Sequence, residues 1–402
     1  MTVKSRAGSA VLRIGVDARD LLVAQRTGVE RLVSHFVSEA DAIGACKFVL
    51  FFDRAPPLEL AGHWRHDVVV EPLRFTALRK LLDTWVLLQL PGALRRNRID
   101  AFISFNTKFP VWAHIPAFAT VHGVEWYFYP KGYRLLERFK QRLWFELSSR
   151  YCAGIITFSD SSERDIFRIR PGCNVPVCMV PEGCDPIFRR LAAEEATPDV
   201  LARYGLSAPY ILSVSSLVPR KNVDGLLRAF AKLRHDHGMS HQLALVGKSG
   251  WKAEALLKLA AKLGIAEHVR FLGFVADADL VNLYNQAALF VYPSKYEGFG
   301  LPLLEAMNCG VPVVTANRSA TAEVAGDAAL LIDPDSVKEM AEGMRRAIQD
   351  EGLRARLVGA GAQRVKAYSW TRMTQEICDF VLARVATTRS SGALRFRREE
   401  AQ

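Results

Sequence analysis

The sequence contains no long uninterrupted run of apolar residues. The longest candidate, LLDTWVLLQL at positions 81–90, has ten residues and includes Asp83, whereas a membrane-spanning helix needs about 18–20 apolar residues. The opening residues MTVKSRAGSAVLRIGVDAR likewise hold no apolar stretch of signal-peptide length before the first expected strand. We therefore expect a cytoplasmic chain with neither a leader nor a membrane span.

Cysteine patterns typical of disulfides or zinc sites are also absent. The seven cysteines are an odd number, and their only cluster, Cys173, Cys178 and Cys184, has no histidine nearby. Structural zinc sites use four ligands, with short gaps between paired ligands. We expect free thiols in a reducing compartment instead.

The sequence does contain enough apolar residues for two domains. Half of its 402 residues are hydrophobic and 24% are charged, which is typical of a globular protein, and this length suggests two cores. The net charge is +11, and residues 1–190 carry 27 Lys and Arg against 19 Asp and Glu. This basic first half indicates an anionic partner: a phosphorylated substrate, an anionic membrane surface or a nucleic acid. No nucleic-acid recognition motif is visible, so we expect no nucleic-acid partner.

Short apolar segments alternate with helix-length segments along the chain. They lie at 11–18, 47–52, 101–105, 117–123 and 153–160, and again at 210–216, 242–248, 269–275, 288–294, 311–317 and 328–334. Such βαβ alternation predicts parallel sheets covered on both faces. We predict the α/β class with two doubly wound, Rossmann-like domains, at 10–188 and 189–370, facing a cleft at the carboxyl ends of their strands. The charged residues 388–402 are interpreted as a tail.

The stretch KYEGFGLPLLEAMNCGVPVV places one carboxylate on each side of a glycine-rich turn. Glu297 and Glu305 have seven residues between them, and Gly298 and Gly300 fall between an expected strand and an expected helix. Glycines there allow backbone N–H groups close to a ligand, and a helix N-terminus favours an anion. Phosphate and hydroxyl groups together indicate a sugar nucleotide. The alternative is a plain turn, with Glu305 on the surface of the helix.

Two cations occupy the corresponding position after an earlier strand. In SSLVPRKNVDGLLRAF, Arg220 and Lys221 precede a helix for which Asn222 is a candidate N-cap. This arrangement suits a diphosphate, and the alternative is a solvated basic loop. His122 follows the strand AFATV and would face the same cleft, unless it is only structural.

Two Asp-x-Asp pairs raise the question of a metal. Asp277 and Asp279, and likewise Asp333 and Asp335, immediately precede helical segments. Aspartate at a helix start usually caps the helix. We therefore expect neither a bound metal nor any other cofactor.

Taken together, EGFGLPLLEA, RKN after a strand, VPEGCD and AEVAGDAALLIDP resemble a known family. It is the large family 4, or group 1, of retaining glycosyltransferases with the GT-B fold, which includes many bacterial mannosyltransferases of polysaccharide synthesis. The similarity runs from IGVDAR to YSW and is densest over 210–334. It implies that the helix at 371–387 crosses back to the first domain.

The resemblance also implies roles for the matching side chains. Arg220 and Lys221 would hold the donor diphosphate and stabilise the departing nucleotide. Glu305 would accept hydrogen bonds from the ribose hydroxyls. Glu297 would orient the transferred sugar, and His122 would lie beside that sugar.

The backbone of two loops completes the implied donor site. Gly298, Phe299, Gly300 and Leu301 would bring N–H groups to the sugar and its phosphate, and Gly28 would let the first domain approach the donor. Relatives acting on nucleotide-mannose often have a GIGRY-like turn where this chain has RTGVERLV, and His-Asp where it has His-Gly. The sugar and the acceptor site therefore stay open.

The function implied is a nucleotide-sugar-dependent hexosyltransferase without a metal. The best candidate is retaining transfer of mannose from GDP-mannose to a glycan or polyprenyl-diphosphate-linked acceptor in cell-surface polysaccharide synthesis. A sugar-nucleotide epimerase of the same fold and a non-catalytic sugar-nucleotide-binding protein are the alternatives. A dinucleotide oxidoreductase would need a Gly-x-Gly-x-x-Gly turn, which the sequence lacks.

Two basic amphipathic stretches in the first half, at 74–98 and 131–150, suit docking on an anionic leaflet. Such docking would place the protein peripherally on the inner face of the plasma membrane, within reach of a lipid-linked acceptor. The alternative is two solvated helices packed by their apolar faces.

Overall fold

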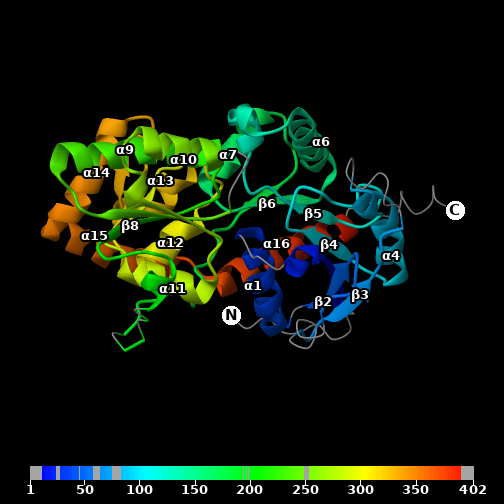
Figure 1. The fold of residues 1–402 in the computed structure, drawn as a ribbon. Coiled ribbons are helices and arrows are strands. Elements are labelled where there is room, and N and C mark those ends of the chain that lie inside the picture. The colour runs from blue at the N-terminus through cyan, green and yellow to red at the C-terminus, as the bar shows by residue number, and fades with distance from the viewer. Residues whose placement is uncertain are drawn as a thin grey trace.

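The computed structural model describes residues 11–23, 28–44, 46–57, 64–74, 83–192, 194–195, 197, 199–248 and 253–390. Two parallel sheets, each with helices on both faces, form two domains that lie side by side (Figure 1). This confirms the predicted α/β class with two doubly wound domains. The predicted domain bounds stay a prediction.

Within the described ranges, the first sheet has seven strands in the order β3-β2-β1-β4-β5-β6-β7. They are β1 (Leu12–Asp17), β2 (Cys46–Phe52), β3 (Asp67–Val70), β4 (Ala101–Ser104), β5 (Ala117–Thr120), β6 (Gly154–Thr157) and β7 (Val177–Met179). Every residue of β4, β5 and β6 is buried, as expected for central strands covered on both faces. The edge strand β3 was not predicted, because only alternate residues of DVVV are half-buried and the run is short.

The helices of the first domain pack their apolar stripes on this sheet. They are α1 (Gly28–Ile43), α4 (Leu90–Arg96), α5 (Glu125–Phe128), α6 (Leu135–Tyr151) and α7 (Asp160–Ile169), with the short 3₁₀ helices η1 (Arg19–Leu22) and η3 (Pro130–Gly132) and the π-helix η2 (Trp85–Gln89). In α1, Leu32, Val33, Phe36, Val37 and Ala40 are buried, which is the spacing of a helix with one apolar face.

In the part of the chain that the structure describes, the second sheet has six strands in the order β10-β9-β8-β11-β12-β13. They are β8 (Tyr210–Val214), β9 (Gln242–Val246), β10 (Val269–Gly273), β11 (Leu289–Tyr292), β12 (Val313–Ala316) and β13 (Leu330–Ile332). The helices are α8 (Asp199–Arg203), α9 (Val223–His237), α10 (Ala253–Lys262), α11 (Asp277–Gln286), α12 (Leu301–Asn308), α13 (Ser319–Ala325), α14 (Val337–Gln349) and α15 (Glu351–Arg364), with turns η4 (Pro219–Lys221), η5 (Ala266–His268), η6 (Gly326–Ala328) and η7 (Val365–Ala367). All six strands fall on segments where strands were expected.

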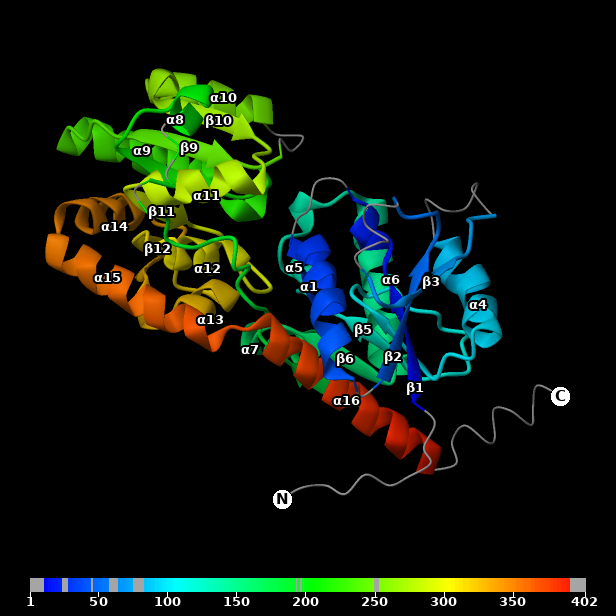
Figure 2. The same cartoon turned by 90° about the horizontal axis from the view of Figure 1, so that it is seen from below.

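The last helix, α16 (Trp370–Ser390), leaves the second domain and lies against α1 and β6 of the first (Figure 2). Its Phe380 ring packs edge-on against Phe118 at 5.7 Å between ring centroids. The helix runs to Ser390 rather than ending at 387, and Arg389 Nη2 pairs with Asp100 Oδ1 at 2.5 Å. The remainder of the predicted tail, 391–402, lies outside the described residues.

The capping interpretations are wrong in detail. Asn222 has a left-handed backbone (φ +57°), and its side chain donates a hydrogen bond to the carbonyl of Pro334 at 2.6 Å instead of capping α9. At α14 the cap is Ser336, whose Oγ accepts from the backbone N–H of Glu339. The four aspartates make ion pairs instead: Asp277 with Arg31, Asp279 with Arg203, and both Asp333 and Asp335 with Arg318.

No helix within the described ranges is long and apolar enough to cross a membrane.

Candidate active site

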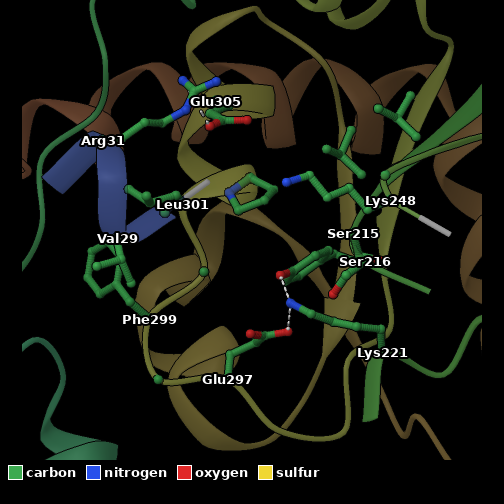
Figure 3. Close-up of a pocket in the computed structure, with 18 of the residues that line it drawn as sticks. Val29, Arg31, Ser215, Ser216, Lys221, Lys248, Glu297, Phe299, Leu301 and Glu305 are labelled. Atoms are coloured by element: carbon green, nitrogen blue, oxygen red, sulfur yellow. Dashed lines mark hydrogen bonds and ion pairs between the residues drawn. The ribbon is translucent and has the colours of Figure 1, made fainter. Parts of the chain in front are cut away.

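A cavity of about 470 Å³ lies between the domains, where strands of both sheets end. All ten residues singled out in the sequence line it: Gly28, His122, Arg220, Lys221, Glu297, Gly298, Phe299, Gly300, Leu301 and Glu305. Gly28 and His122 come from the first domain and the other eight from the second. Figure 3 shows several of them facing one another across the cavity. The structure thus brings these residues together, while their individual roles stay predictions.

A compact charged triad consists of the cations Arg220 and Lys221 and the carboxylate of Glu297. Lys221 Nζ donates to Glu297 Oε1 at 2.5 Å and to the Tyr292 hydroxyl at 2.7 Å (Figure 3). Arg220 Nη1 donates to Glu297 Oε2 at 3.0 Å and to the carbonyl of Tyr296 at 3.1 Å. Both Lys221 and Glu297 are buried, so the alternative of a solvated basic loop is wrong.

Burial and charge set the protonation of this triad. Burial by itself would raise the pKa of Glu297, but Lys221 and Arg220 outweigh it and lower the pKa to about 2. Burial lowers the pKa of Lys221 to about 8, although Glu297 opposes that shift. For Arg220 burial favours the neutral form, yet Glu297 and Glu125 raise its pKa above the usual value. Two cations against one carboxylate leave the triad with a surplus positive charge that suits an anionic ligand.

The loop after β11 holds its glycines for steric reasons. Gly300 has φ +116°, a conformation that other residues rarely adopt, and it directly precedes α12. A Cβ at Gly298 would lie 1.5 Å from the carbonyl oxygen of His122. Ser159 Oγ and Ser162 Oγ donate to the carbonyl of Gly298 at 2.7 and 3.0 Å. The first domain therefore clamps this loop of the second domain at a residue with no side chain.

Glu305 points from α12 into the cavity. Tyr284 donates its hydroxyl to Glu305 Oε2 at 2.8 Å. Arg31 Nη1 lies 3.8 Å from Oε1, and Figure 3 shows the two side chains next to each other. Burial raises the pKa of Glu305, and Arg31 and Tyr284 oppose that shift. Because Glu305 is buried, the alternative of a surface carboxylate on a plain turn is wrong.

His122 has one ring nitrogen committed to the fold. Nε2 lies 2.8 Å from the carbonyl oxygen of Phe105, and that oxygen only accepts, so Nε2 carries the proton. Burial lowers the pKa of His122, which favours the neutral ring with Nδ1 left as an acceptor. Nδ1 lies 3.9 Å from Glu182 Oε1, and burial raises the pKa of Glu182 to about 8.

Several residues that line the cavity were missed in the sequence. Ser215 and Lys248 closely follow β8 and β9, so the rule that ligands bind at the carboxyl ends of strands would have found them. Glu182 lies in the VPEGCD stretch that carries part of the resemblance, although no role was attached to it. Arg31 lies in the RTGVERLV stretch, but no role was attached to its side chain, because its partner Asp277 is 246 residues away in the chain.

Within the described ranges, no three His, Cys, Asp or Glu side chains are grouped so that they could hold a metal ion. All seven cysteines are free thiols.

Two family models match the chain, one on each domain. The model described as glycosyl transferases group 1 matches residues 204–364, and the model described as glycosyltransferase family 4 matches residues 26–188. The chain belongs to the group 1 glycosyl transferases. The domain that carries the charged triad is the one that the group 1 model matches.

Relatives of this group 1 glycosyl transferase include two proteins of Escherichia coli. The chain is 38% identical over 226 residues to O-antigen chain mannosyltransferase B, which is 55% of this chain and 58% of that protein. It is 34% identical over 170 residues to the serotype-specific mannosyltransferase WbdA, which is 42% of this chain and 21% of WbdA. The chain therefore matches less than two thirds of the length of either relative.

The fold is the GT-B fold. The crystal structure of Anabaena HepE in complex with UDP and glucose superposes with a TM-score of 0.73 at 18% identity, covering 93% of this chain and 100% of that one. This likeness confirms the predicted two-domain architecture.

Proposed function

We propose that this group 1 glycosyl transferase moves a hexosyl group from a nucleoside-diphosphate sugar to a hydroxyl of a glycan or lipid-linked acceptor in polysaccharide synthesis. The observation that carries the proposal is the cavity in which Arg220, Lys221 and Glu297 form a cationic triad opposite Glu305. The mannosyltransferase names of two relatives support GDP-mannose as the donor. The motif resemblance supports transfer with retention at the anomeric carbon.

The triad would act on the departing diphosphate. As the bond to the sugar breaks, negative charge grows on the leaving phosphate and positive charge on the sugar ring. Arg220 and Lys221 already lie in a buried site, so they stabilise that charge without reorganisation of water. At the N-terminus of α12, which begins with Leu301 and Pro302, the backbone N–H groups of Gly300 and Leu301 would add to the same anion site. In this proposal no metal takes part.

Glu297 would exchange partners during donor binding. In the ligand-free protein both of its oxygens accept from the two cations. A bound diphosphate would accept hydrogen bonds from the same two cations. Lone pairs of the Glu297 carboxylate would then become available to accept from sugar hydroxyls. His122 Nδ1, the ring nitrogen not held by Phe105, would accept from another sugar hydroxyl on the opposite wall. The sugar would thus be held from both domains.

The test is a product assay with matched variants. Purified protein would be incubated with GDP-mannose, UDP-glucose or dTDP-glucose and octyl α-mannoside as the acceptor probe. We expect nucleoside diphosphate release with a mannosylated product from GDP-mannose. Arg220→Met should lower kcat about 100- to 1,000-fold, the loss typical of one transition-state charge contact. Arg228→Met, an exposed arginine on α9, is the control.

The outcomes separate the alternatives. An epimerised nucleotide-sugar without transfer would replace this proposal by the epimerase. Thermal shifts with nucleotide-sugars but no product with any donor would favour a non-catalytic binder. Near-normal turnover in Arg220→Met would remove the assigned role of the triad.

We further propose that the beginning of α6 docks on an anionic membrane. Leu135, Leu136 and Phe139 are 85%, 50% and 62% exposed, and Arg134 and Arg138 are exposed beside them. An exposed apolar group flanked by cations fits an interface of acyl chains and anionic headgroups. The other basic stretch offers less: 75–82 lie outside the described residues, and Trp85, Val86, Leu90 and Leu94 are buried.

Co-sedimentation with vesicles tests this docking. Binding should require phosphatidylglycerol in phosphatidylcholine vesicles and should fall at least about fivefold in the double variant Leu135→Ser, Phe139→Ser. Arg345→Ser on the second domain is the control. Binding that ignores the anionic lipid, or that survives the double substitution, would contradict the proposal. Loss of a dimer in the double variant would assign the patch to a second copy instead.

A further inference from the structure

Arg31 reaches from the first domain into the second. It lies on α1, one turn after Gly28, and its Nη2 pairs with Asp277 Oδ1 at the start of α11. Its Nη1 lies 3.6 Å from Asp185 Oδ2 and 3.8 Å from Glu305 Oε1, and the guanidinium lies over the Phe188 ring at 4.8 Å. The guanidinium is therefore held in one orientation by the Asp277 ion pair and by the Phe188 ring.

The Nη1 group has no hydrogen-bond partner in the part of the chain that the structure describes, although the Arg31 side chain is only 9% exposed. A buried donor without a partner is rare in folded proteins because it costs free energy. Arg31 lines the same cavity as Glu305 (Figure 3). The unpaired Nη1 group is therefore available to donate to an atom that enters that cavity.

One carboxylate oxygen of Glu305 likewise has no hydrogen-bond donor among the described residues. Its Oε2 is taken by the Tyr284 hydroxyl, while no hydrogen bond from the described residues reaches Oε1. The 3.8 Å between Nη1 and Oε1 is too long for a direct hydrogen bond, but an oxygen about 2.8 Å from each would satisfy both. Such an atom must accept from Arg31 and donate to Glu305, which is the chemistry of a ligand hydroxyl or of the water molecule that this hydroxyl would displace.

The surrounding charge excludes a phosphate at this position. Asp185, Asp277 and Glu305 all lie around the one guanidinium. A further anion would meet three carboxylates, whereas a neutral hydroxyl adds no charge. The diphosphate has its own cations, Arg220 and Lys221, in another part of the cavity.

We propose that Arg31 is a specificity-determining residue for the donor nucleotide: its Nη1 donates to a ribose hydroxyl that in turn donates to Glu305 Oε1. The ribose then bridges the two domains, and a nucleotide that lacks this hydroxyl leaves two buried groups unpaired. This inference rests on the proposed function, since it assumes a nucleoside-diphosphate donor.

Titration calorimetry with deoxynucleotides tests the assignment. GDP, 2′-deoxy-GDP and 3′-deoxy-GDP, and the same three forms of UDP, would be titrated into the wild type, Arg31→Met and Glu305→Gln. The wild type should bind one deoxy form about 10- to 100-fold more weakly than its ribonucleotide. In Arg31→Met this ratio should fall to about threefold or less, and Glu305→Gln should behave likewise.

Controls separate ribose recognition from a purely structural role. Arg203 forms an ion pair with Asp279, which lies two residues after Asp277. The variant Arg203→Met should therefore keep the wild-type ratio of ribonucleotide to deoxynucleotide affinity. Arg31→Lys retains the positive charge and replaces Arg31→Met in the test if that variant does not fold. Its ratio of ribonucleotide to deoxynucleotide affinity should also fall, because the shorter lysine side chain cannot pair with Asp277 and reach the ribose hydroxyl at the same time.

Failure of this inference differs from failure of the proposed function. If Glu305→Gln loses the discrimination while both Arg31 variants keep it, Arg31 only braces the domains and the inference is overturned. If neither GDP nor UDP binds the wild type, the proposed function and the inference both fail.

Discussion

Replacing Gly298 by alanine should part the two domains at the active site. The new Cβ would lie 1.5 Å from the carbonyl oxygen of His122, where ordinary contacts begin near 3.4 Å, so the two loops must separate by about 2 Å. The neighbouring atom is a backbone oxygen of His122, two residues beyond the buried strand β5, so no side-chain rotation relieves the contact. The hydrogen bonds from Ser159 and Ser162 to Gly298 would be lost as well.

The substitution Gly298→Ala should lower kcat more than it weakens nucleotide binding. Misplacing reacting groups by about 1 Å can cost 100-fold, so we expect kcat for mannosyl transfer to octyl α-mannoside to fall more than about 100-fold. Arg220, Lys221 and Glu305 all lie in the second domain, so separation of the domains should cost nucleotide binding only the contact from Arg31 of the first domain, and the Kd for GDP should rise about tenfold. Small-angle X-ray scattering should show a larger radius of gyration.

Gly172→Ala is the matched control, since a Cβ there meets no atom within 4 Å. It should leave kcat, Kd and the radius of gyration unchanged. A Gly298→Ala protein with kcat within about threefold of the wild type would refute the reasoning that this clamped loop positions the reacting groups.

Three further predictions concern protonation, one hydrogen bond and the crossing helix. The pKa of Lys221 is about 8 in the free protein, and a diphosphate favours the charged form of this lysine. The affinity for GDP, measured by calorimetry, should therefore fall as the pH rises through about 8, and Lys221→Arg should remove this pH dependence. A wild-type affinity that does not change with pH would contradict the prediction. Tyr284→Phe removes the donor to Glu305 Oε2 and should raise the Kd for GDP about three- to tenfold with kcat nearly unchanged; a loss confined to kcat would argue against a ribose role for Glu305. Ile377→Ala, in the fully buried face of α16, should lower the free energy of unfolding in urea by about 2–5 kcal/mol, whereas an unchanged midpoint would show that α16 is dispensable for stability.

The sequence was sufficient for the order of the strands in the second domain and for most of the second-domain site. Each of β8 to β13 is a short apolar run between helices, so its type and place follow from local composition. Arg220, Lys221, Glu297 and Glu305 were found because cations and acids lie beside glycine-rich turns at strand ends. Their positions depend on the local chain, which the sequence shows directly.

What the sequence could not show depends on contacts between distant segments. Arg31 lies on an ordinary amphipathic helix, and only the docking of the domains brings it to Asp277 and Glu305. Asn222 was misjudged for the same reason, because its side chain finds Pro334, 112 residues away, instead of its own helix. Local propensity cannot reveal a partner supplied by tertiary structure.

The crossing of α16 also has a consequence for how the protein is made. Met373, Ile377 and Val381 of this helix belong to the same apolar cluster as Leu32 and Phe36 of α1. A ribosome adds roughly 5–20 residues per second, so about 10–40 s pass between synthesis of the first domain's last strand and emergence of α16. During that interval the nascent first domain has an uncovered apolar stripe. The second domain must therefore be translated before α16 can cover the apolar face of α1 and complete the core of the first domain. Until then, this apolar face is exposed and chaperones can bind it.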